Sequence, residues 1–330
     1  MMSSIKVVIL GVGSVGSGIV QTLQNRKGIE VVGAIDIDPE KIGKDVGELT
    51  GGSAIGVAVT NDLEAFCAEK KADVIINTAS PVGIQETYQQ LIPALKSGMN
   101  AIVASAETCN LEFTDKEIAE EIDRLCKENG VSYIGRGATQ TEERFIISMT
   151  EGSTDVKNIA FTHYADVQAF SDESNAAEWG ITLQEEDYYK GIEAGTVKSK
   201  EELKASIPYV ADAFGWKIDD VTLDKAPMVN ESGRVYGLKA TVRGFQDGEQ
   251  KLEMNYVMVE DPERKYYDHL KVEGTPMIDC MCNYTPDRGM ASTIGSIVNA
   301  IPFIADAPAG YHNTLKSPAC GIYFGDNSRN

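Results

Sequence analysis

The sequence has no long apolar run and few cysteines. No stretch reaches the roughly 20 consecutive apolar residues that a bilayer-spanning helix needs, and the first residues lack the basic and apolar segments of a secretory signal. The six cysteines are irregularly spaced over 330 residues, which is typical of free thiols in a reducing cytosol. We therefore expect a cytoplasmic protein that is not embedded in a membrane.

Positive charge and histidine are also scarce. The 30 Lys and Arg residues face 50 Asp and Glu residues, for a formal net charge of −20. This balance argues against nucleic acid or an anionic membrane surface as a partner. Cys280 and Cys282 are the only closely spaced cysteines, and with just 3 histidines in the chain no complementary ligand pair lies near them. The sequence therefore predicts no metal site.

A glycine motif stands out among the features that are present. The Gly-x-Gly-x-x-Gly segment 11–16 directly follows the apolar run 7–10 and opens a helical pattern, and a second apolar run then ends at Asp36. In such a unit the first glycine permits a tight turn, the second lets backbone N–H groups approach a pyrophosphate, and the third lets helix and strand pack closely. The helix N-terminus adds a favourable dipole for the phosphates. The motif predicts a dinucleotide site whose contacts are Gly11, Gly13, Ser14, Val15, Gly16 and Asp36.

The acid after the second apolar run indicates which dinucleotide binds. The Asp36 carboxylate can accept hydrogen bonds from the adenosine ribose hydroxyls and would repel a 2′-phosphate, which favours NAD over NADP. Asp38 is a rival for this role, although the pair Asp38-Pro39 is better explained as a helix cap followed by a first-turn proline. Lys41 and Lys44 lie close enough in the sequence to leave NADP possible.

Two patterns divide the chain into domains. Strand-like and helical segments alternate over 1–137, which predicts an α/β Rossmann domain with a doubly wound parallel sheet. Over 138–285 several strand-like segments alternate in polarity, which predicts a second α+β domain with a mostly antiparallel sheet for substrate binding and dimerisation. The segment 286–330 begins with a helical pattern and is expected to return to the nucleotide domain. The strands of the second domain are expected near 158–166, 235–243, 252–260 and 269–273.

Loops after the predicted parallel strands are the expected site segments, because ligands of doubly wound sheets bind outside the carboxyl ends of the strands. The loop 78–80 is predicted to flank the cofactor ribose or nicotinamide, with an ordinary polar turn as an equal alternative. The loops 105–108 and 135–140 follow the next two strands. The candidate cofactor contacts here are Thr78, Ala79, Ser80 and Ser105, and the candidate substrate contacts are Arg136, Thr139 and Gln140.

Glu107 is the candidate catalytic residue. A carboxylate at the carboxyl end of a strand, beside the nicotinamide, would be partly desolvated and could exchange a proton or stabilise a developing iminium cation. The structural alternative is an acid at a helix terminus or in a hinge salt bridge. Arg136 would pair either with Glu107 or with a substrate carboxylate.

The histidines do not form a recognisable motif. His163 lies in a strand-like run and is better explained as a hydrogen-bonded sheet residue, although it stays a candidate substrate contact. His269 and His312 favour surface or loop positions. No nucleophile-elbow sequence is present, so covalent hydrolysis is not expected.

Segments over nearly the whole chain resemble a known family. They are 33–45, 105–107 (Ser-Ala-Glu), 211–216 (Ala-Asp-Ala-Phe-Gly-Trp), 298–302 (Val-Asn-Ala-Ile-Pro) and 306–310 (Asp-Ala-Pro-Ala-Gly). On these residues the chain resembles the dihydrodipicolinate-reductase-like superfamily, and within it the 2,4-diaminopentanoate dehydrogenase and native amine dehydrogenase family. It departs from that family at 139–142, where Thr-Gln-Thr-Glu replaces the common Asn-Pro-Gly-Phe. It also lacks the paired histidines and the lysine motif of true dihydrodipicolinate reductases.

The resemblance implies reversible oxidative deamination with NAD, or possible use of NADP. A primary amine, such as 2,4-diaminopentanoate, gives hydride to the nicotinamide, and water converts the iminium ion to a carbonyl and ammonia. The resemblance implies that Glu107 contacts the amine and that the enzyme is a homodimer, and we expect Asn299 in the matching segment 298–302 to contact the cofactor. Two alternatives stay open: an oxidoreductase on this scaffold that acts on a carbon–oxygen or cyclic-imine substrate, and a non-catalytic NAD(H)-binding sensor.

Overall fold

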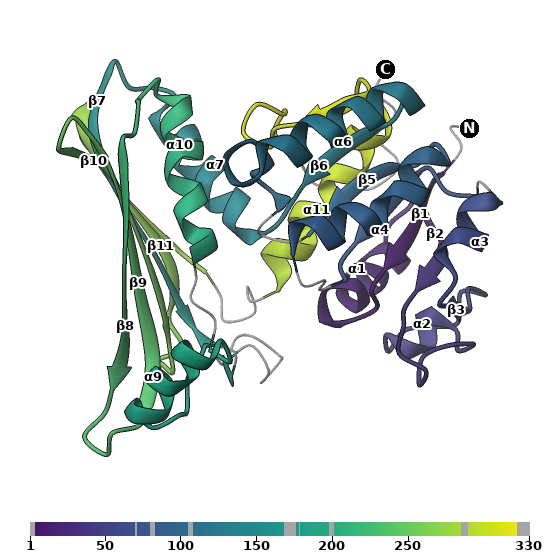
Figure 1. The fold of residues 1–330 in the computed structure, drawn as a ribbon, viewed down its shortest axis with the longest axis horizontal. Coiled ribbons are helices and arrows are strands. Elements are labelled where there is room, and N and C mark those ends of the chain that lie inside the picture. Colours follow the sequence, from purple (N-terminus) through teal and green to yellow (C-terminus); the bar gives the residue numbers. More distant parts are fainter. Residues whose placement is uncertain are drawn as a thin grey trace. The chain divides into compact units, whose positions relative to one another are not determined.

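The chain folds into two compact units. The computed structural model describes residues 4–69, 71–79, 83–104, 108–167, 176–177, 179–197, 201–284 and 290–321. One unit consists of Met1–Gln140 together with Ala291–Asn330, and the other of Thr141–Met290. Each unit is built around a sheet of its own (Figure 1).

The helices of those described ranges are short or carry polar residues. None of the helices in them is both long enough and apolar enough to cross a bilayer.

The first unit contains a seven-stranded sheet in the order β13-β6-β5-β4-β1-β2-β3, with every neighbouring pair parallel. Its first six strands have the order 3-2-1-4-5-6 that characterises a doubly wound dinucleotide-binding fold. The predicted Rossmann sheet is therefore confirmed. The strands are β1 (Ile5–Leu10), β2 (Ile29–Ile35), β3 (Val59–Thr60), β4 (Val74–Asn77), β5 (Asn100–Val103), β6 (Ser132–Gly135) and β13 (Gly310–His312).

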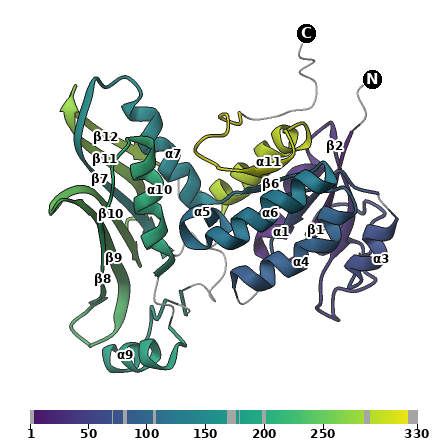
Figure 2. The ribbon, with the colours of Figure 1, turned by 45° about the horizontal axis from the view of Figure 1, so that its top comes forward.

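Helices cover both faces of this sheet because its strands are apolar on both sides (Figure 2). In β1, Val7 and Ile9 face one core, which includes side chains of α1 (Ser14–Gln24) and α11 (Ala291–Ala305). Val8 and Leu10 face the other core, with α4 (Ile84–Lys96) and α6 (Lys116–Asn129). The shorter helices of this unit are α2 (Val46–Leu49), α3 (Leu63–Ala68) and α5 (Leu111–Thr114).

The last part of the chain belongs to the first unit. Helix α11 packs in its core, and β13 adds a parallel edge strand that pairs with β6, with Gly310 opposite Ser132. The helix was predicted from the sequence, whereas the strand, which is only three residues long, was not.

The second unit contains a six-stranded sheet in the order β12-β11-β7-β10-β9-β8. Only β7 and β10 pair in parallel, so the predicted mostly antiparallel sheet is confirmed. Strands β8 and β12 were not predicted. The strands are β7 (Asp155–Asp166), β8 (Asp220–Val229), β9 (Val235–Gln246), β10 (Glu249–Val259), β11 (Tyr266–Thr275) and β12 (Ile278–Asn283).

One face of the second sheet carries the helices of this unit (Figure 1). Alternate residues such as Phe161 of β7 and Met254 of β10 pack with Ile146 and Val210, which come from α7 (Ala138–Thr150) and α10 (Ser206–Ala213). Helix α9 (Glu185–Ala194) and the 3-10 turn Glu201–Ala205 also belong to this unit. Because strand side chains alternate, the residues between these core positions lie on the opposite face.

Candidate functional site

The glycine loop follows β1 at the centre of the parallel sheet, where β1 lies between β2 and β4. A Cβ atom on Gly11 would lie 2.4 Å from the Ala79 backbone nitrogen, and Gly11 also has a φ of +91°. A Cβ on Gly16 would lie 2.1 Å from the Gly11 carbonyl oxygen. At Gly13 no atom of a residue beyond its chain neighbours lies within 4 Å of the corresponding position. Packing therefore explains two of the glycines, whereas Gly13 leaves open space beside the backbone, as the pyrophosphate-approach glycine should.

Helix α1 begins at this open position. Gly13 is its N-cap residue and provides no side-chain hydrogen bond, and Ser14 and Val15 form its first turn. The positive end of the helix dipole therefore lies next to the space at Gly13. The residues at this point fit the phosphates of a dinucleotide.

Asp36 directly follows β2 and contacts the same loop. Its Oδ2 accepts hydrogen bonds from the Val12 backbone N–H at 2.7 Å and from Lys41 Nζ at 3.0 Å, and Oδ1 accepts one from the Asp38 N–H at 2.9 Å. Burial raises the pKa of Asp36, but the bonds from Asp38, Lys41 and Val12 outweigh it and hold the pKa below its usual value. The side chain is thus an ionised carboxylate that braces the glycine loop and pairs with Lys41.

Asp38 has a different role from the one its sequence predicted. Its Oδ1 accepts from the Glu40 N–H within a series of turns over 39–43. The expected helix after Pro39 is therefore absent from this described segment, and that prediction was wrong. A local hydrogen bond from the backbone to an Asp side chain stabilises a turn as readily as a helix start.

The loop after β4 supports the glycine loop. Thr78 Oγ1 donates to the Gly11 carbonyl oxygen at 2.6 Å, and the Ala79 N–H donates to the Leu10 carbonyl at 3.0 Å. Thr78 and Ala79 thus lie next to the predicted cofactor site, and their observed hydrogen bonds go to the protein. The predicted contacts Ser80, Ser105 and Glu107 lie outside the described residues.

The other sequence candidates of the first unit lie on separate elements. Arg136 is 4% exposed, and its Nη2 donates to Ser317 Oγ at 3.2 Å. Thr139 and Gln140 lie in the first turn of α7. Asn299 lies on α11, and its buried Oδ1 has no hydrogen-bond partner within the described ranges. Their predicted contacts with substrate or cofactor stay predictions.

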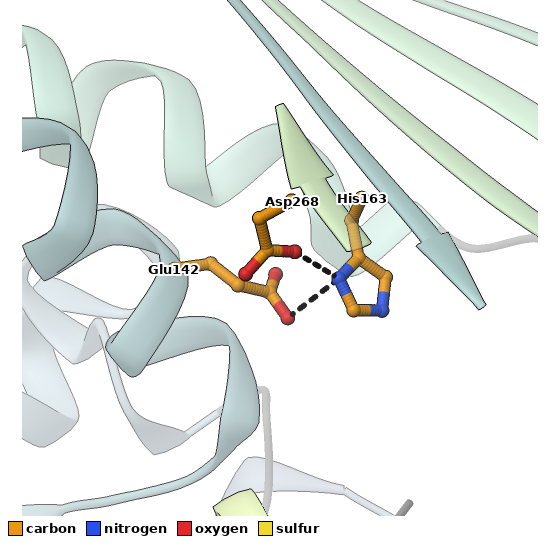
Figure 3. A group of neighbouring side chains, drawn as sticks. All are labelled: Glu142, His163 and Asp268. Atoms are coloured by element: carbon orange, nitrogen blue, oxygen red, sulfur yellow. Dashed lines mark hydrogen bonds and ion pairs between the residues drawn. The ribbon is translucent and has the colours of Figure 1, made fainter. Parts of the chain in front are cut away.

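The second unit contains a group of buried polar side chains on the same face of its sheet as its apolar core. Nδ1 of His163 on β7 lies 2.7 Å from Asp268 Oδ1 on β11 and 3.3 Å from Glu142 Oε1 on α7 (Figure 3). The three residues are 3%, 1% and 3% exposed, in that order. We call Glu142, His163 and Asp268 the carboxylate cluster. Among the described residues, these three side chains are also the group that could bind a metal ion. Their possible ligand atoms all lie within 4.8 Å of one another.

Two tyrosines extend this cluster. Tyr284 donates its hydroxyl hydrogen bond to Asp268 Oδ2 at 2.9 Å, and the Tyr266 hydroxyl lies 3.4 Å from His163 Nε2. Nδ1 of His163 faces an oxygen of each of the two carboxyl groups, and carboxylate oxygens accept hydrogen bonds, so this arrangement suits a proton on Nδ1. The structure therefore shows the hydrogen-bonded sheet histidine that the sequence favoured.

Sequence reasoning missed Glu142 and Asp268. A signal for Asp268 was available, because it is in phase with Leu270 and Val272 on a strand whose alternate residues are buried. A charged residue at such a position indicates a buried polar contact. No local signal separates Glu142 from the other acids of the chain.

Comparisons with known proteins agree with this architecture. Residues 142–329 match the family model described as the 2,4-diaminopentanoate dehydrogenase C-terminal domain, and residues 5–134 match the dihydrodipicolinate reductase N-terminus. A 2,4-diaminopentanoate dehydrogenase of Acetoanaerobium sticklandii is 29% identical, over 98% of this chain and 96% of that protein. A 4-hydroxy-tetrahydrodipicolinate reductase of Methanococcus maripaludis is 36% identical over 37% of this chain and 44% of its own length.

The fold has a solved counterpart. The structure of an amine dehydrogenase from Mycobacterium smegmatis superposes with a TM-score of 0.83 at 23% identity, covering 98% of this chain and 99% of that one. The first family model spans more than half of the sequence, from residue 142 to residue 329. The chain therefore belongs to the family defined by the 2,4-diaminopentanoate dehydrogenase C-terminal domain.

Proposed function

We propose that the protein is an NAD(P)-dependent amine dehydrogenase that reversibly converts a primary amine to a carbonyl compound and ammonia. The observation that carries this proposal is the similarity to a 2,4-diaminopentanoate dehydrogenase over 98% of this chain and 96% of the relative. A relation of that extent includes both the nucleotide-binding unit and the second unit. The name of the relative supplies 2,4-diaminopentanoate as the candidate substrate.

The residues of the first unit support a dinucleotide cofactor. The space at Gly13 and the first turn of α1 would receive the pyrophosphate, and Asp36 would accept hydrogen bonds from the adenosine ribose. The Asp36 charge favours NAD, whereas Lys41, 3.0 Å away, offsets part of the repulsion of a 2′-phosphate and leaves NADP usable. When bound, the nicotinamide supplies the hydride acceptor.

Glu107 is our proposed catalytic residue. It follows the last residue of β5 by four positions in the sequence, and doubly wound folds bind ligands beyond the carboxyl ends of their strands. Its carboxylate would accept a proton from the substrate ammonium and would stabilise the iminium cation left by hydride loss. It would also orient the water that attacks that cation.

We also propose a cytoplasmic homodimer. All six cysteines are free thiols, as in proteins of a reducing compartment. On the sheet face opposite the helices, the half-buried rings of Tyr164 and Tyr267 stack with centroids 4.9 Å apart. A second copy of the chain would cover this aromatic surface, and symmetric pairing is the commonest way to do so.

An assay of cofactor reduction tests the proposed reaction. NAD and NADP are each offered with 2,4-diaminopentanoate, simple primary amines, amino acids and the matching alcohols. We expect reduction with an amine and none with its alcohol. Reduction with alcohols alone would favour a carbon–oxygen oxidoreductase, and tight NADH binding without turnover on any substrate would favour a sensor.

A further inference from the structure

We propose that Asp45 is a positioning residue for the cofactor site, and that it sets the discrimination between NAD and NADP by holding Lys41 in place beside Asp36. This inference rests on the proposed use of a dinucleotide and deepens it. All three residues belong to the first unit. Asp45 is not among the expected cofactor contacts, so its effect would pass through Lys41, whose Nζ lies 3.0 Å from Asp36 Oδ2.

The turn that carries Lys41 lacks apolar packing. It consists of residues 37–44, which follow β2 and Asp36, and none of these residues is buried. Its two large apolar side chains, Ile37 and Ile42, are 90% and 38% exposed. A segment without buried apolar contacts keeps its position mainly through hydrogen bonds to its surroundings. The place of Lys41 therefore depends on how the two ends of the turn are bonded.

Both ends of this turn are hydrogen-bonded to β3. At the start of the turn, the Asp36 N–H donates to the Thr60 carbonyl oxygen at 2.9 Å. At its end, the Gly43 N–H donates to the Val59 carbonyl oxygen at 2.8 Å, and the Val59 N–H donates to the Lys44 carbonyl oxygen at 2.9 Å. Strand β3 has only two residues and lies at the edge of the sheet. Its position relative to the turn therefore depends on the segment that precedes it.

The Asp45 carboxylate fixes that preceding segment. Its Oδ1 accepts a hydrogen bond from the Gly47 N–H at 2.8 Å, in the first turn of α2. Its Oδ2 accepts from the N–H of Gly56 at 2.7 Å and from that of Val57 at 3.1 Å. One side chain thus joins the two arms of the loop 45–57, which contains α2 and leads into β3 (Figure 1). The turn and β3 are therefore held together directly beside Lys41.

The charge of Asp45 strengthens these bonds. Burial raises the pKa of Asp45, but hydrogen bonds from backbone N–H groups, first those of Ile55 and Glu48, outweigh it and hold the pKa below its usual value. The side chain is therefore an ionised carboxylate at neutral pH, and hydrogen bonds to a charged acceptor are stronger than those between neutral groups. Asparagine has the same size, but it lacks the charge and would direct an NH2 group at one of the two arms.

Preorganisation of Lys41 connects Asp45 to the choice of cofactor. The ammonium group of Lys41 is held beside Asp36, where the 2′-phosphate of NADP would approach. A lysine already in place offsets the repulsion by Asp36 at no further cost in side-chain entropy, whereas a lysine on a loosened turn must be ordered when NADP binds. Loss of the Asp45 hydrogen bonds should therefore weaken NADP and affect NAD, which has no 2′-phosphate, much less.

Affinities for NADH and NADPH, measured by fluorescence titration without any substrate, test this inference. Asp45→Asn should weaken NADPH about fivefold, the scale of ordering one long side chain, and NADH less than twofold. The same change is then made in a Lys41→Gln background. There Asp45→Asn should leave the ratio of the two affinities unchanged, because the residue through which it acts is missing.

A matched control is another capping aspartate of the first unit. Asp115 Oδ1 accepts from the Ile118 N–H at 3.1 Å at the start of α6, which packs in the other core of the sheet. Asp115→Asn and Asp45→Asn should both lower the melting temperature, and only the latter should change the ratio of affinities. If Asp45→Asn does not fold, Asp45→Ser takes its place. Serine can still cap α2 but has a single oxygen for the two arms of the loop, so the same shift is expected.

The possible outcomes separate this inference from the proposed reaction. Equal weakening of NADH and NADPH in Asp45→Asn would overturn the inference, because it would show a purely structural role. Unchanged NADPH affinity would also overturn it, as would a full shift of the ratio in the Lys41→Gln background. A failure to oxidise any amine would overturn the proposed reaction and leave this result standing, since no substrate enters the titration. A wild type that binds neither dinucleotide would overturn both.

Discussion

Asp36 performs two roles with one carboxylate. It braces the glycine loop through the Val12 N–H, and it presents a negative charge where the adenosine ribose is expected. Lys41, 3.0 Å from its Oδ2, reduces that charge locally. We therefore expect the balance between this carboxylate and the neighbouring ammonium group to set the cofactor preference.

Cofactor preference should respond to both residues of this pair. Asp36→Ala removes the ribose acceptor and the repulsion of a 2′-phosphate, so the preference for NAD should fall about tenfold, the scale of one charged contact. Lys41→Gln should raise that preference by a similar factor. The measurement is kcat/KM with NAD and with NADP. Lys44→Gln is the control, since Lys44 forms no ion pair with Asp36 in the described part of the chain, and a wild type that prefers NADP would contradict this account.

Glu107 is tested by removing its charge at constant size. Glu107→Gln loses both the proton acceptor and the electrostatic stabilisation of the iminium cation. We expect kcat to fall at least ~100-fold, as when a single preorganised electrostatic group is removed. NADH affinity, followed by fluorescence titration, should stay nearly unchanged. A variant with most of its activity would show that Glu107 is structural.

The sequence predicted some elements well and missed others. The parallel strands of the first unit are short, continuous apolar runs such as Val74–Asn77, and connecting helices such as α6 carry a regular apolar stripe, here Ile118, Ile122 and Leu125. Strand β8 was missed because Asp220–Val229 mixes charged residues with Pro227. Strand β13 was missed because three residues are too few to show a period.

The residues of the candidate sites also differ in whether the sequence could predict them. Gly13 and Asp36 could be found because their spacing is local and defined by one βαβ unit. The carboxylate cluster could not, because His163 and Asp268 are 105 positions apart and meet only through the β7–β11 register. That register depends on which strands become neighbours, which the local pattern of either strand does not specify.

Substitutions of the three glycines in the β1–α1 turn should affect different properties, namely stability at Gly11 and Gly16 and NAD affinity at Gly13. Gly11→Ala and Gly16→Ala place a Cβ against backbone atoms, at 2.4 and 2.1 Å, so each should lower the melting temperature sharply. Gly13 has a φ of −84°, which alanine adopts without strain, and free space around it. Gly13→Ala should therefore melt near the wild type and bind NAD at least about tenfold more weakly, because a methyl group would occupy the pyrophosphate approach. Calorimetry that shows wild-type affinity would exclude Gly13 from the cofactor site.

At the scale of the whole molecule, each unit has a core of its own. The first unit needs both ends of the chain, since α11 completes the core beneath β1 and α1. The second unit is continuous in sequence from Thr141 to Met290 and presents its helices on one face of its sheet. The opposite face, with the stacked Tyr164 and Tyr267, is the surface that we expect to meet a second copy.

The oligomeric state tests that expectation. Light scattering at micromolar concentration should give twice the mass of the chain. Tyr164→Glu and Tyr267→Glu together should yield a folded monomer, because they place charges within an aromatic contact. Asp279→Asn is the control and should remain dimeric. A wild-type monomer at micromolar concentration would contradict the proposed dimer.

The central claim is the oxidation of a carbon–nitrogen bond, and the ratio of its products tests it most directly. The wild-type enzyme is incubated with NAD and 2,4-diaminopentanoate, and the NADH and ammonia formed are quantified in the same sample. Hydride transfer followed by hydrolysis of the iminium ion predicts one ammonia per NADH throughout the reaction, and the reverse reaction should consume the two equally. NADH formed without ammonia, or no NADH from any amine, would contradict the account.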